Sequence, residues 1–383
     1  MTARIRLLFS VIAALLIAAV PALATPASAS SASIAETTFA HPMFVLGHAA
    51  PGFAQPNATP AGYGPANLQS AYKLPSSTAG SGQTVAIVDA YNDPTAEADL
   101  GVYRAQYGLP SCTTANGCFK KVNQTGGTSY PPTDAGWATE ISLDLDMVSA
   151  ICPKCHILLV EATSASYANL GQAVNEAAAL HANAISNSYG GGDISDSSAP
   201  FYNHPGIAVT ASSGDSGYGV QFPASSHYVT AVGGTTLNTA SNSRGWSETV
   251  WSGAGSGCST LNAALSGAAG FNTGCSKRAE ADVSAVANPS TGVAVYDSTP
   301  YNGRSGWQVY GGTSVSSPII ASVFALAGNT ASINNNYPYS HSTSFFDVTS
   351  GSNGSCSPTQ LCHARVGWDG PTGLGTPNGT GGF

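Results

Sequence analysis

The stretch TVAIVDA at residues 84–90 is a continuous apolar run, and NDPTAEADLGVYRAQYGL at 92–109 follows it. The run predicts a strand buried on both faces, and the second stretch predicts a helix with Asp93 as N-cap and Pro94 at its first position. The same reasoning predicts a helix over 164–183 and strands at 156–162, 184–188, 207–212 and 228–234. This alternation indicates an α/β fold with a mostly parallel sheet, whose sites gather at the carboxyl ends of strands.

Composition limits the class of protein further. The chain has 383 residues, of which 43% are hydrophobic, so it can bury a sizeable core. Charged residues make up only 8%, against the ~25% of an ordinary globular protein. The formal net charge is -8, and no basic cluster exceeds Lys120 with Lys121. We therefore expect no nucleic-acid or membrane partner, and we expect a monomer.

The first 60 residues have the pattern of an exported protein. Arg4 and Arg6 precede an apolar stretch over 7–20, and small residues in an A-x-A pattern follow at 27–29. This pattern predicts a secretory signal peptide over 1–29 and hence a secreted, extracellular protein. Residues 30–60, rich in Ala, Pro and Ser, are interpreted as an extended leader or short propeptide, with the folded domain over 61–383.

The even number of Cys residues, eight, suits an oxidising compartment. Their spacing favours nearest-neighbour disulfides, although many other connectivities exist. The expected pairs are Cys112 with Cys118, Cys152 with Cys155, Cys258 with Cys275, and Cys356 with Cys362. The C-x-x-C at Cys152 leaves a zinc or redox role open as an alternative.

A candidate nucleophile lies in GGTSVSSPIIASVFALA, at residues 311–327. Ser314 stands where a glycine turn leads into an apolar helix, a position that exposes a hydroxyl and favours negative charge nearby. The segment resembles the nucleophile segment of subtilisin-like peptidases, whose His begins a helix after a strand that ends in Asp. Asp89 does end the first predicted strand, but none of the eight His residues begins such a helix.

Two acids occupy the expected helix instead. In GWATEISLDLDMVSAI, at 136–151, Glu140 and Asp144 are four residues apart and share one face. Apolar neighbours surround that face, so the pair is predicted to point inward, whereas Asp146 is predicted to face solvent. One carboxylate could accept the Ser314 proton while the other holds the first in place. The alternative is a half-exposed structural pair.

A further acid, Asp215, lies in TASSGDSGYG at 210–219, a glycine-flanked turn after a buried strand. An ionised carboxylate would repel an oxyanion, but a protonated one can donate a hydrogen bond to it. This role requires acidic conditions. Taken alone, the turn has an ordinary composition.

The three segments together resemble the sedolisin family of serine-carboxyl peptidases, over a region from about Gly62 to the C-terminus. The resemblance implies a subtilisin-like three-layer α/β sandwich and an endopeptidase that cleaves proteins or peptides in acid. Ser314 would be the nucleophile, Glu140 the general base, Asp144 its orienting partner and Asp215 the oxyanion carboxyl.

The resemblance also implies one structural Ca²⁺ ion in C-terminal loops. Its ligands would be the carboxylates of Asp347 and Asp369 and the carbonyl oxygens of Val348, Arg365 and Gly367, and such oxygen donors suit Ca²⁺. Family members usually have Gly where this chain has Arg365. They also carry a folded propeptide of well over a hundred residues, whereas about thirty separate the predicted signal cleavage point from this domain.

Two other functions stay open at this point. One is a secreted binding protein that keeps the peptidase fold without turnover, and the other is a His-dependent subtilisin active at neutral pH. Labelling of Ser314 by a serine-directed probe would separate the first from an enzyme. Activity that rises toward pH 8 and survives Glu140→Gln would indicate the second.

Overall fold

The computed structural model describes Ala35, residues 37–47 and residues 60–383, so the predicted signal peptide lies outside the described residues. The helices are α2 (Pro65–Ala71), α3 (Ala96–Gln106), α4 (Ala135–Ile151), α5 (Tyr167–Ala179), α6 (Thr313–Ala327) and α7 (Tyr337–Ser340). Short 3-10 turns are η1 (Ser266–Phe271), η2 (Pro289–Thr291), η3 (Thr330–Ser332), η4 (Ser342–Ser344) and η5 (Thr359–Leu361).

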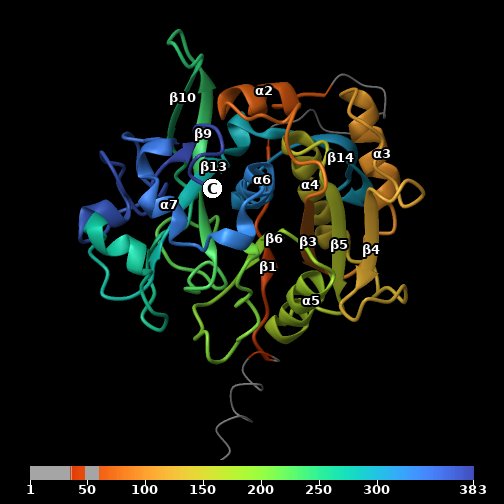
Figure 1. The fold of residues 1–383 in the computed structure, drawn as a ribbon, viewed down its shortest axis with the longest axis horizontal. Coiled ribbons are helices and arrows are strands. Elements are labelled where there is room, and N and C mark those ends of the chain that lie inside the picture. Colours follow the sequence, from red (N-terminus) through yellow and green to blue (C-terminus); the bar gives the residue numbers. More distant parts are fainter. Residues whose placement is uncertain (1–34, 36, 48–59) are drawn as a thin grey trace, which may run out of the picture.

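The central sheet has eight strands within the described residues and is mostly parallel (Figure 1). Its main path runs through β10 (Trp246–Val250), β9 (Thr230–Thr239), β8 (Ala208–Ser212), β6 (Ala184–Asn187), β3 (Thr84–Ala90), β5 (His156–Ala162) and β4 (Phe119–Asn123). β13 (Val283–Val286) also pairs with β9, in parallel, and β10 is antiparallel to β9. The predicted α/β class with a mostly parallel sheet is confirmed.

Smaller sheets surround this core. Their strands are β1 (His41–Pro42) with β7 (Tyr189–Gly190), β2 (Val45–Leu46) with β14 (Val293–Tyr301) and β15 (Arg304–Gly311), β11 (Gly257–Cys258) with β12 (Ala279–Glu280), and β16 (Phe345–Phe346) with β17 (Thr376–Pro377).

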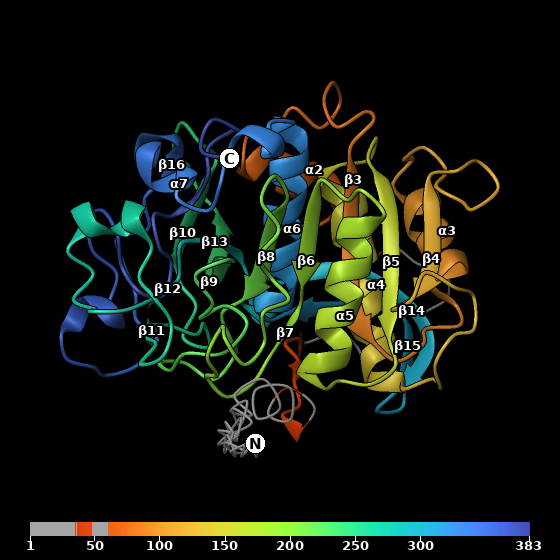
Figure 2. The same cartoon turned by 60° about the horizontal axis from the view of Figure 1, so that its bottom comes forward.

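Helices cover both faces of the central sheet. Figure 2 shows α5 in front of β3, β5 and β6, with α4 and α6 behind them. Side chains of β3 alternate between the two layers: Ile87 packs into the core on the α4 and α6 side, and Val88 into the core with α5. Strands buried on both faces are mostly apolar, which explains the nearly continuous run that predicted them.

Helix α4 corrects one prediction. Asp146 was predicted to face solvent, but it is buried, and its Oδ2 accepts a hydrogen bond of 2.9 Å from the backbone N–H of Tyr296 in β14. The prediction was wrong because β14 packs against α4. This second covering layer comes from a segment about 150 residues away, and helix periodicity cannot indicate it.

Local features agree more closely with the sequence. The four predicted disulfides form, and Cys152 is bonded to Cys155. Helix α3 begins at Ala96 rather than near Pro94, because Asp93 Oδ1 binds the N–H and hydroxyl of Thr95 in a turn before the helix. In the described part of the chain, no helix combines the length and hydrophobicity needed to cross a membrane.

Candidate active site

Ser314 is the second residue of α6, and its surroundings come from the carboxyl edge of the sheet. Gly312 precedes the helix with a φ of 97°, and an added Cβ there would lie 2.2 Å from the Met43 carbonyl oxygen. Glycine is therefore required by both conformation and space. The serine is fully buried, and its Oγ donates to the Ser188 carbonyl oxygen at 3.3 Å.

Glu140 and Asp144 lie buried on α4, which packs against α6. The N-cap Asp134 begins this helix by accepting two backbone N–H groups through Oδ1. Asp144 Oδ1 accepts a 2.7 Å hydrogen bond from Ser188 Oγ. Neither oxygen of Glu140 has a hydrogen-bond partner among the described residues. Glu140 is thus a buried carboxyl free to exchange a proton, while Asp144 is anchored.

The electrostatics of this cluster favour protonation. Burial raises the pKa of Glu140 well above its usual value, and the charge of Asp144 adds to the rise, whereas the nearby Ser314 hydroxyl opposes it. Burial also raises the pKa of Asp144, opposed by the hydrogen bond from Ser188. Asp89, at the end of β3, joins them, because burial and the charge of Asp144 raise its pKa as well. Three close carboxyls cannot all ionise, so they must share protons.

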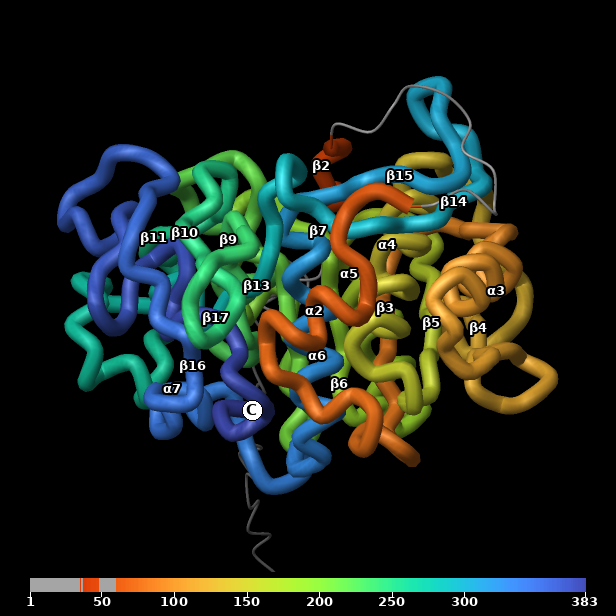
Figure 3. Tube along the Cα trace, turned by 90° about the horizontal axis from the view of Figure 1, so that it is seen from above, coloured from red at the N-terminus to blue at the C-terminus, as the bar shows by residue number. Residues whose placement is uncertain are grey.

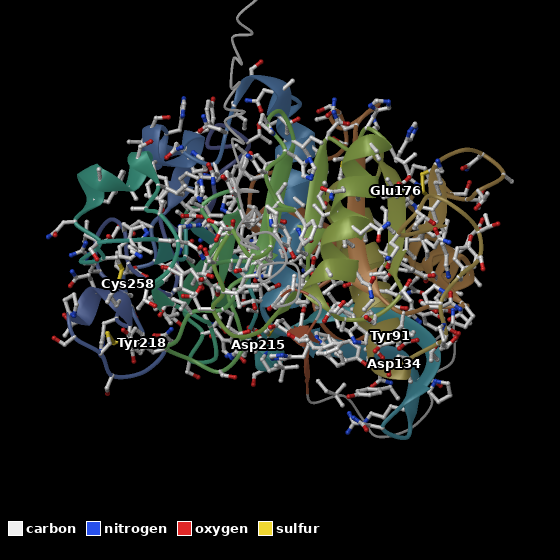
Figure 4. All side chains as sticks on the ribbon, turned by 90° about the horizontal axis from the view of Figure 1, so that it is seen from below. Tyr91, Asp134, Glu176, Asp215, Tyr218 and Cys258 are labelled. Atoms are coloured by element: carbon white, nitrogen blue, oxygen red, sulfur yellow. A yellow bond between two sulfur atoms is a disulfide. The ribbon has the colours of Figure 1, made fainter. Side chains whose placement is uncertain are left out.

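Asp215 lies beside the start of α6, next to the residue that precedes Ser314. It follows β8, and its Oδ1 accepts hydrogen bonds from the N–H and hydroxyl of Thr313 at 2.7 and 2.8 Å. Its Oδ2 is shielded from solvent and has no partner among the described residues, although the residue as a whole is partly exposed. Burial raises the pKa of Asp215 to about 7. Figure 4 labels Asp215, Tyr91 and Asp134 along one edge of the sheet, the edge that carries the site.

A backbone segment that contains Met43 passes between Ser314 and Asp215. The Ser314 N–H donates a 2.9 Å hydrogen bond to the Met43 carbonyl oxygen. The added Cβ on Gly312 would lie 2.6 Å from Asp215 Oδ2 as well as 2.2 Å from that carbonyl oxygen, so the two oxygens lie close together around one point. A carbonyl oxygen therefore already occupies the place between the serine N–H and the Asp215 carboxyl.

The structure thus brings together all four residues predicted for the catalytic site: Ser314, Glu140, Asp144 and Asp215. Sequence reasoning missed Ser188, which links Asp144 to the serine through its hydroxyl and carbonyl oxygen. From the sequence, Asp89 was identified only as the acidic residue that ends a predicted strand. Both follow apolar runs at the carboxyl edge, the signal that could have found them. No His among the described residues hydrogen-bonds with Ser314 or Glu140.

Four of the five residues predicted as calcium ligands lie close together in the C-terminal loops, and the fifth, Val348, follows Asp347 in the chain. Gly367 N–H donates to Asp347 Oδ2 at 2.9 Å, and Arg365 N–H to Asp369 Oδ2 at 3.3 Å. The carbonyl oxygens of Val348, Arg365 and Gly367 accept no hydrogen bond from the described residues.

The charges around these loops also suit a cation. The Arg365 guanidinium turns away from the two acids, onto the carbonyl oxygens of Trp368 and Phe271. Free carbonyls beside two carboxylates fit the oxygen donors that Ca²⁺ takes. No group of three or more acidic, His or Cys side chains that could hold a metal is present in the described ranges.

Fold and site together define a subtilisin-like α/β protein in which a serine faces carboxyl groups in place of histidine. The sequence profile of the subtilase family matches residues 126–342. Kumamolisin from Bacillus sp. (strain MN-32) is 30% identical over 367 residues, and sedolisin from Pseudomonas sp. (strain 101) is 33% identical over 177 residues. The chain therefore belongs to the sedolisin family, within the subtilases.

A solved structure supports the same fold. Pseudomonas sedolisin, complexed with two molecules of pseudo-iodotyrostatin, superposes with a TM-score of 0.71 at 27% identity, covering 84% of this chain and 96% of that one. The predicted subtilisin-like fold is confirmed. The chain spans 63% of kumamolisin and 29% of Pseudomonas sedolisin as full sequences, and those alignments cover 84% and 42% of this chain.

Proposed function

We propose that this chain is a secreted serine-carboxyl endopeptidase that hydrolyses proteins or peptides at acidic pH. The observation that carries the proposal is the geometry around Ser314: a free buried carboxyl lies on one side, and a second, Asp215, lies beside its N–H on the other. The family is one of peptidases, which supports the same reaction class.

The reaction begins at the serine hydroxyl. Ser314 Oγ attacks the substrate carbonyl carbon while Glu140 accepts its proton and later delivers it to the leaving amine. Asp144, held by Ser188, orients Glu140 and shares protons with it. The oxyanion receives hydrogen bonds from the Ser314 N–H and from protonated Asp215. Water then attacks the acyl-enzyme and regenerates the serine.

The expected pH dependence follows from the same groups. Asp215 donates a hydrogen bond only while protonated, and its pKa of about 7 sets the upper limit of activity. Glu140 must be ionised to act as a base. Because Glu140, Asp144 and Asp89 share protons, one of them ionises at a lower pH than the others and sets the lower limit. This assignment differs from a His-dependent subtilisin, whose activity would rise toward pH 8.

Secretion and calcium binding complete the proposal. The four disulfides suit an oxidising compartment outside the cytosol. Asp347 and Asp369, with neighbouring carbonyl oxygens, would hold one Ca²⁺ ion, which would tie the C-terminal loops together. The ion takes no part in the reaction steps above.

The test is cleavage of an unfolded protein near pH 4 by the wild type, Ser314→Ala and Glu140→Gln. We expect Ser314→Ala to abolish turnover and Glu140→Gln to reduce it at least 10²-fold. Asp134→Asn, a change of an acid outside the cluster, is the matched control and should stay near wild type. Turnover that survives Ser314→Ala would refute the proposal, and an inactive wild type would favour a binding protein.

A further inference from the structure

Residues 37–47, here called the strap, cross the candidate active site, where the Met43 carbonyl oxygen accepts a hydrogen bond from the Ser314 N–H. Figure 3 shows β2, near one end of the strap, next to β15. On one side of Ser314, β1 pairs antiparallel with β7, and Ala40 N–H donates to the Ala165 carbonyl oxygen at 2.9 Å. On the other side, β2 pairs antiparallel with β15. The strap is thus held as an added strand, the way many peptides bind to the edge of a sheet.

At the centre of the strap, the Met43 backbone adopts the position of a substrate residue. Its N–H donates to the Ser188 carbonyl oxygen at 3.2 Å, and its carbonyl oxygen accepts from the Ser314 N–H at 2.9 Å. The same oxygen lies beside Asp215 Oδ2. The two groups expected to stabilise an oxyanion, the Ser314 N–H and the Asp215 carboxyl, therefore both lie beside one carbonyl group, that of the Met43–Phe44 bond.

The side chains of Met43 and Phe44, on either side of that bond, each pack against residues of the domain. Met43 is 2% exposed, and its Cε would lie 2.8 Å from a Cβ added to Gly190, whose neighbour Gln221 closes the same pocket. The Phe44 ring makes edge contacts with Tyr301 and Tyr310, with centroids 5.7 and 5.6 Å away. Phe39, by contrast, is 57% exposed. Packing contacts therefore hold the two side chains that flank one bond.

We propose that the Met43–Phe44 peptide bond is the chain's own processing site, and that the strap fills the substrate groove until Ser314 cleaves it. This inference rests on the proposed function, because it uses the same nucleophile. It also assigns a preference: a long unbranched apolar side chain before the scissile bond and an aromatic one after it.

The cleavage balances as an ordinary hydrolysis. Ser314 Oγ forms an ester with the Met43 carbonyl carbon, its proton passes through Glu140 to the Phe44 nitrogen, and the C–N bond breaks. Water then attacks the ester, and its proton passes through Glu140 back to Ser314 Oγ. The products are a carboxylate on Met43 and a new amino terminus on Phe44, with one water consumed.

The two halves of the strap then separate differently. Ser314 is uncovered for other substrates once the segment that ends at Met43 gives up its pairing with β7. The segment that begins at Phe44 remains paired with β15, where Gly47 N–H donates to the Val309 carbonyl oxygen at 2.8 Å. Because strap and nucleophile belong to one chain, the cleavage is intramolecular and its rate does not depend on protein concentration.

The full chain is folded at pH 9, two units above the Asp215 pKa of about 7, and is then shifted to pH 4 while its amino terminus is followed by mass spectrometry. We expect a new terminus at Phe44, formed with one rate constant over a 100-fold dilution, and no cleavage in Ser314→Ala. Met43→Lys places a charge in the buried pocket and should slow processing about 100-fold. Phe39→Lys, the same change at an exposed position of the strap, should stay within about threefold. Circular dichroism checks that both variants fold.

A synthetic peptide of residues 37–47 provides a measurement independent of folding, and processed enzyme should cut it between Met43 and Phe44. Processing that speeds up with protein concentration, a first cut at another bond, or equal rates for the two Lys variants would overturn the inference. If an unfolded protein is digested while the strap stays intact, the strap assignment fails and the proposed function stands. If neither is cut, both fail together.

Discussion

Replacing Asp215 with Asn exchanges a hydrogen-bond donor that titrates for one that does not. Asp215 Oδ1 accepts from the N–H and hydroxyl of Thr313, and an Asn side-chain oxygen can keep both hydrogen bonds. The amide NH₂ then stands where Oδ2 lies beside the oxyanion position. The substitution therefore preserves shape and donor and removes only the dependence of that donor on protonation.

The size of the effect follows from the pKa of Asp215, which burial raises to about 7. Above that value the protonated fraction falls tenfold per pH unit, so wild-type kcat/KM should be roughly tenfold lower at pH 8 than its plateau value. Asp215→Asn should show no such decline between pH 6 and 8. Its plateau should lie below that of the wild type, by less than the roughly 10²–10³-fold expected when a donor is removed altogether.

The assay is kcat/KM on an unfolded protein or a fluorogenic peptide from pH 3 to 9, with circular dichroism at each pH to confirm folding. Asp215→Ala is the control, because it removes the donor and should lose activity at every pH. If Asp215→Asn keeps the wild-type decline above pH 7, another group sets that limit and the oxyanion role of Asp215 is wrong.

The remaining predictions concern stability, specificity and metal binding. In Ser314→Ala the free energy of unfolding should fall as pH rises from about 4 to 7, since buried carboxyls with raised pKa values bind protons more tightly when folded; urea titrations that show a rise would contradict this. Gly190→Ala fills the Met43 pocket and should shift preference at least about tenfold from Met toward Ala before the scissile bond, measured with paired peptides; an unchanged ratio would remove Gly190 from that pocket. Calcium should raise the Tm of the Ser314→Ala variant but not that of the Ser314→Ala/Asp347→Asn double variant. If a chelator changes the Tm of neither variant, the metal site is excluded. Asp146→Ala leaves the Tyr296 N–H unpaired and should cost about 1–3 kcal/mol in urea unfolding, whereas a cost as large for Asp146→Asn would point to charge instead.

Sequence predicted those parts of the site that depend on local geometry. Glu140 and Asp144 share a face because they are four residues apart on one helix, and the helix could be located from its apolar pattern. Ser314 and Asp215 could be placed because each adjoins a glycine turn next to an apolar segment. Asp146 was misplaced by the same reasoning, since a helix pattern says which residues share a face but not how many layers cover the helix.

The sequence alone determined the class of fold, because that class follows from the alternation of apolar runs and helical patterns. The sequence also pointed to the four candidate catalytic residues, through local geometry together with a family resemblance. Spacing favoured the four disulfide pairs, and the structure decided among the possible connectivities. Only the tertiary structure decided which charges meet, and it brought Asp89 and Ser188 to the cluster. It alone also showed that Met43 lies over Ser314. Pairing of a strap with β7 and β15 depends on contacts between segments more than a hundred residues apart, and a short extended segment carries no pattern that names its partner.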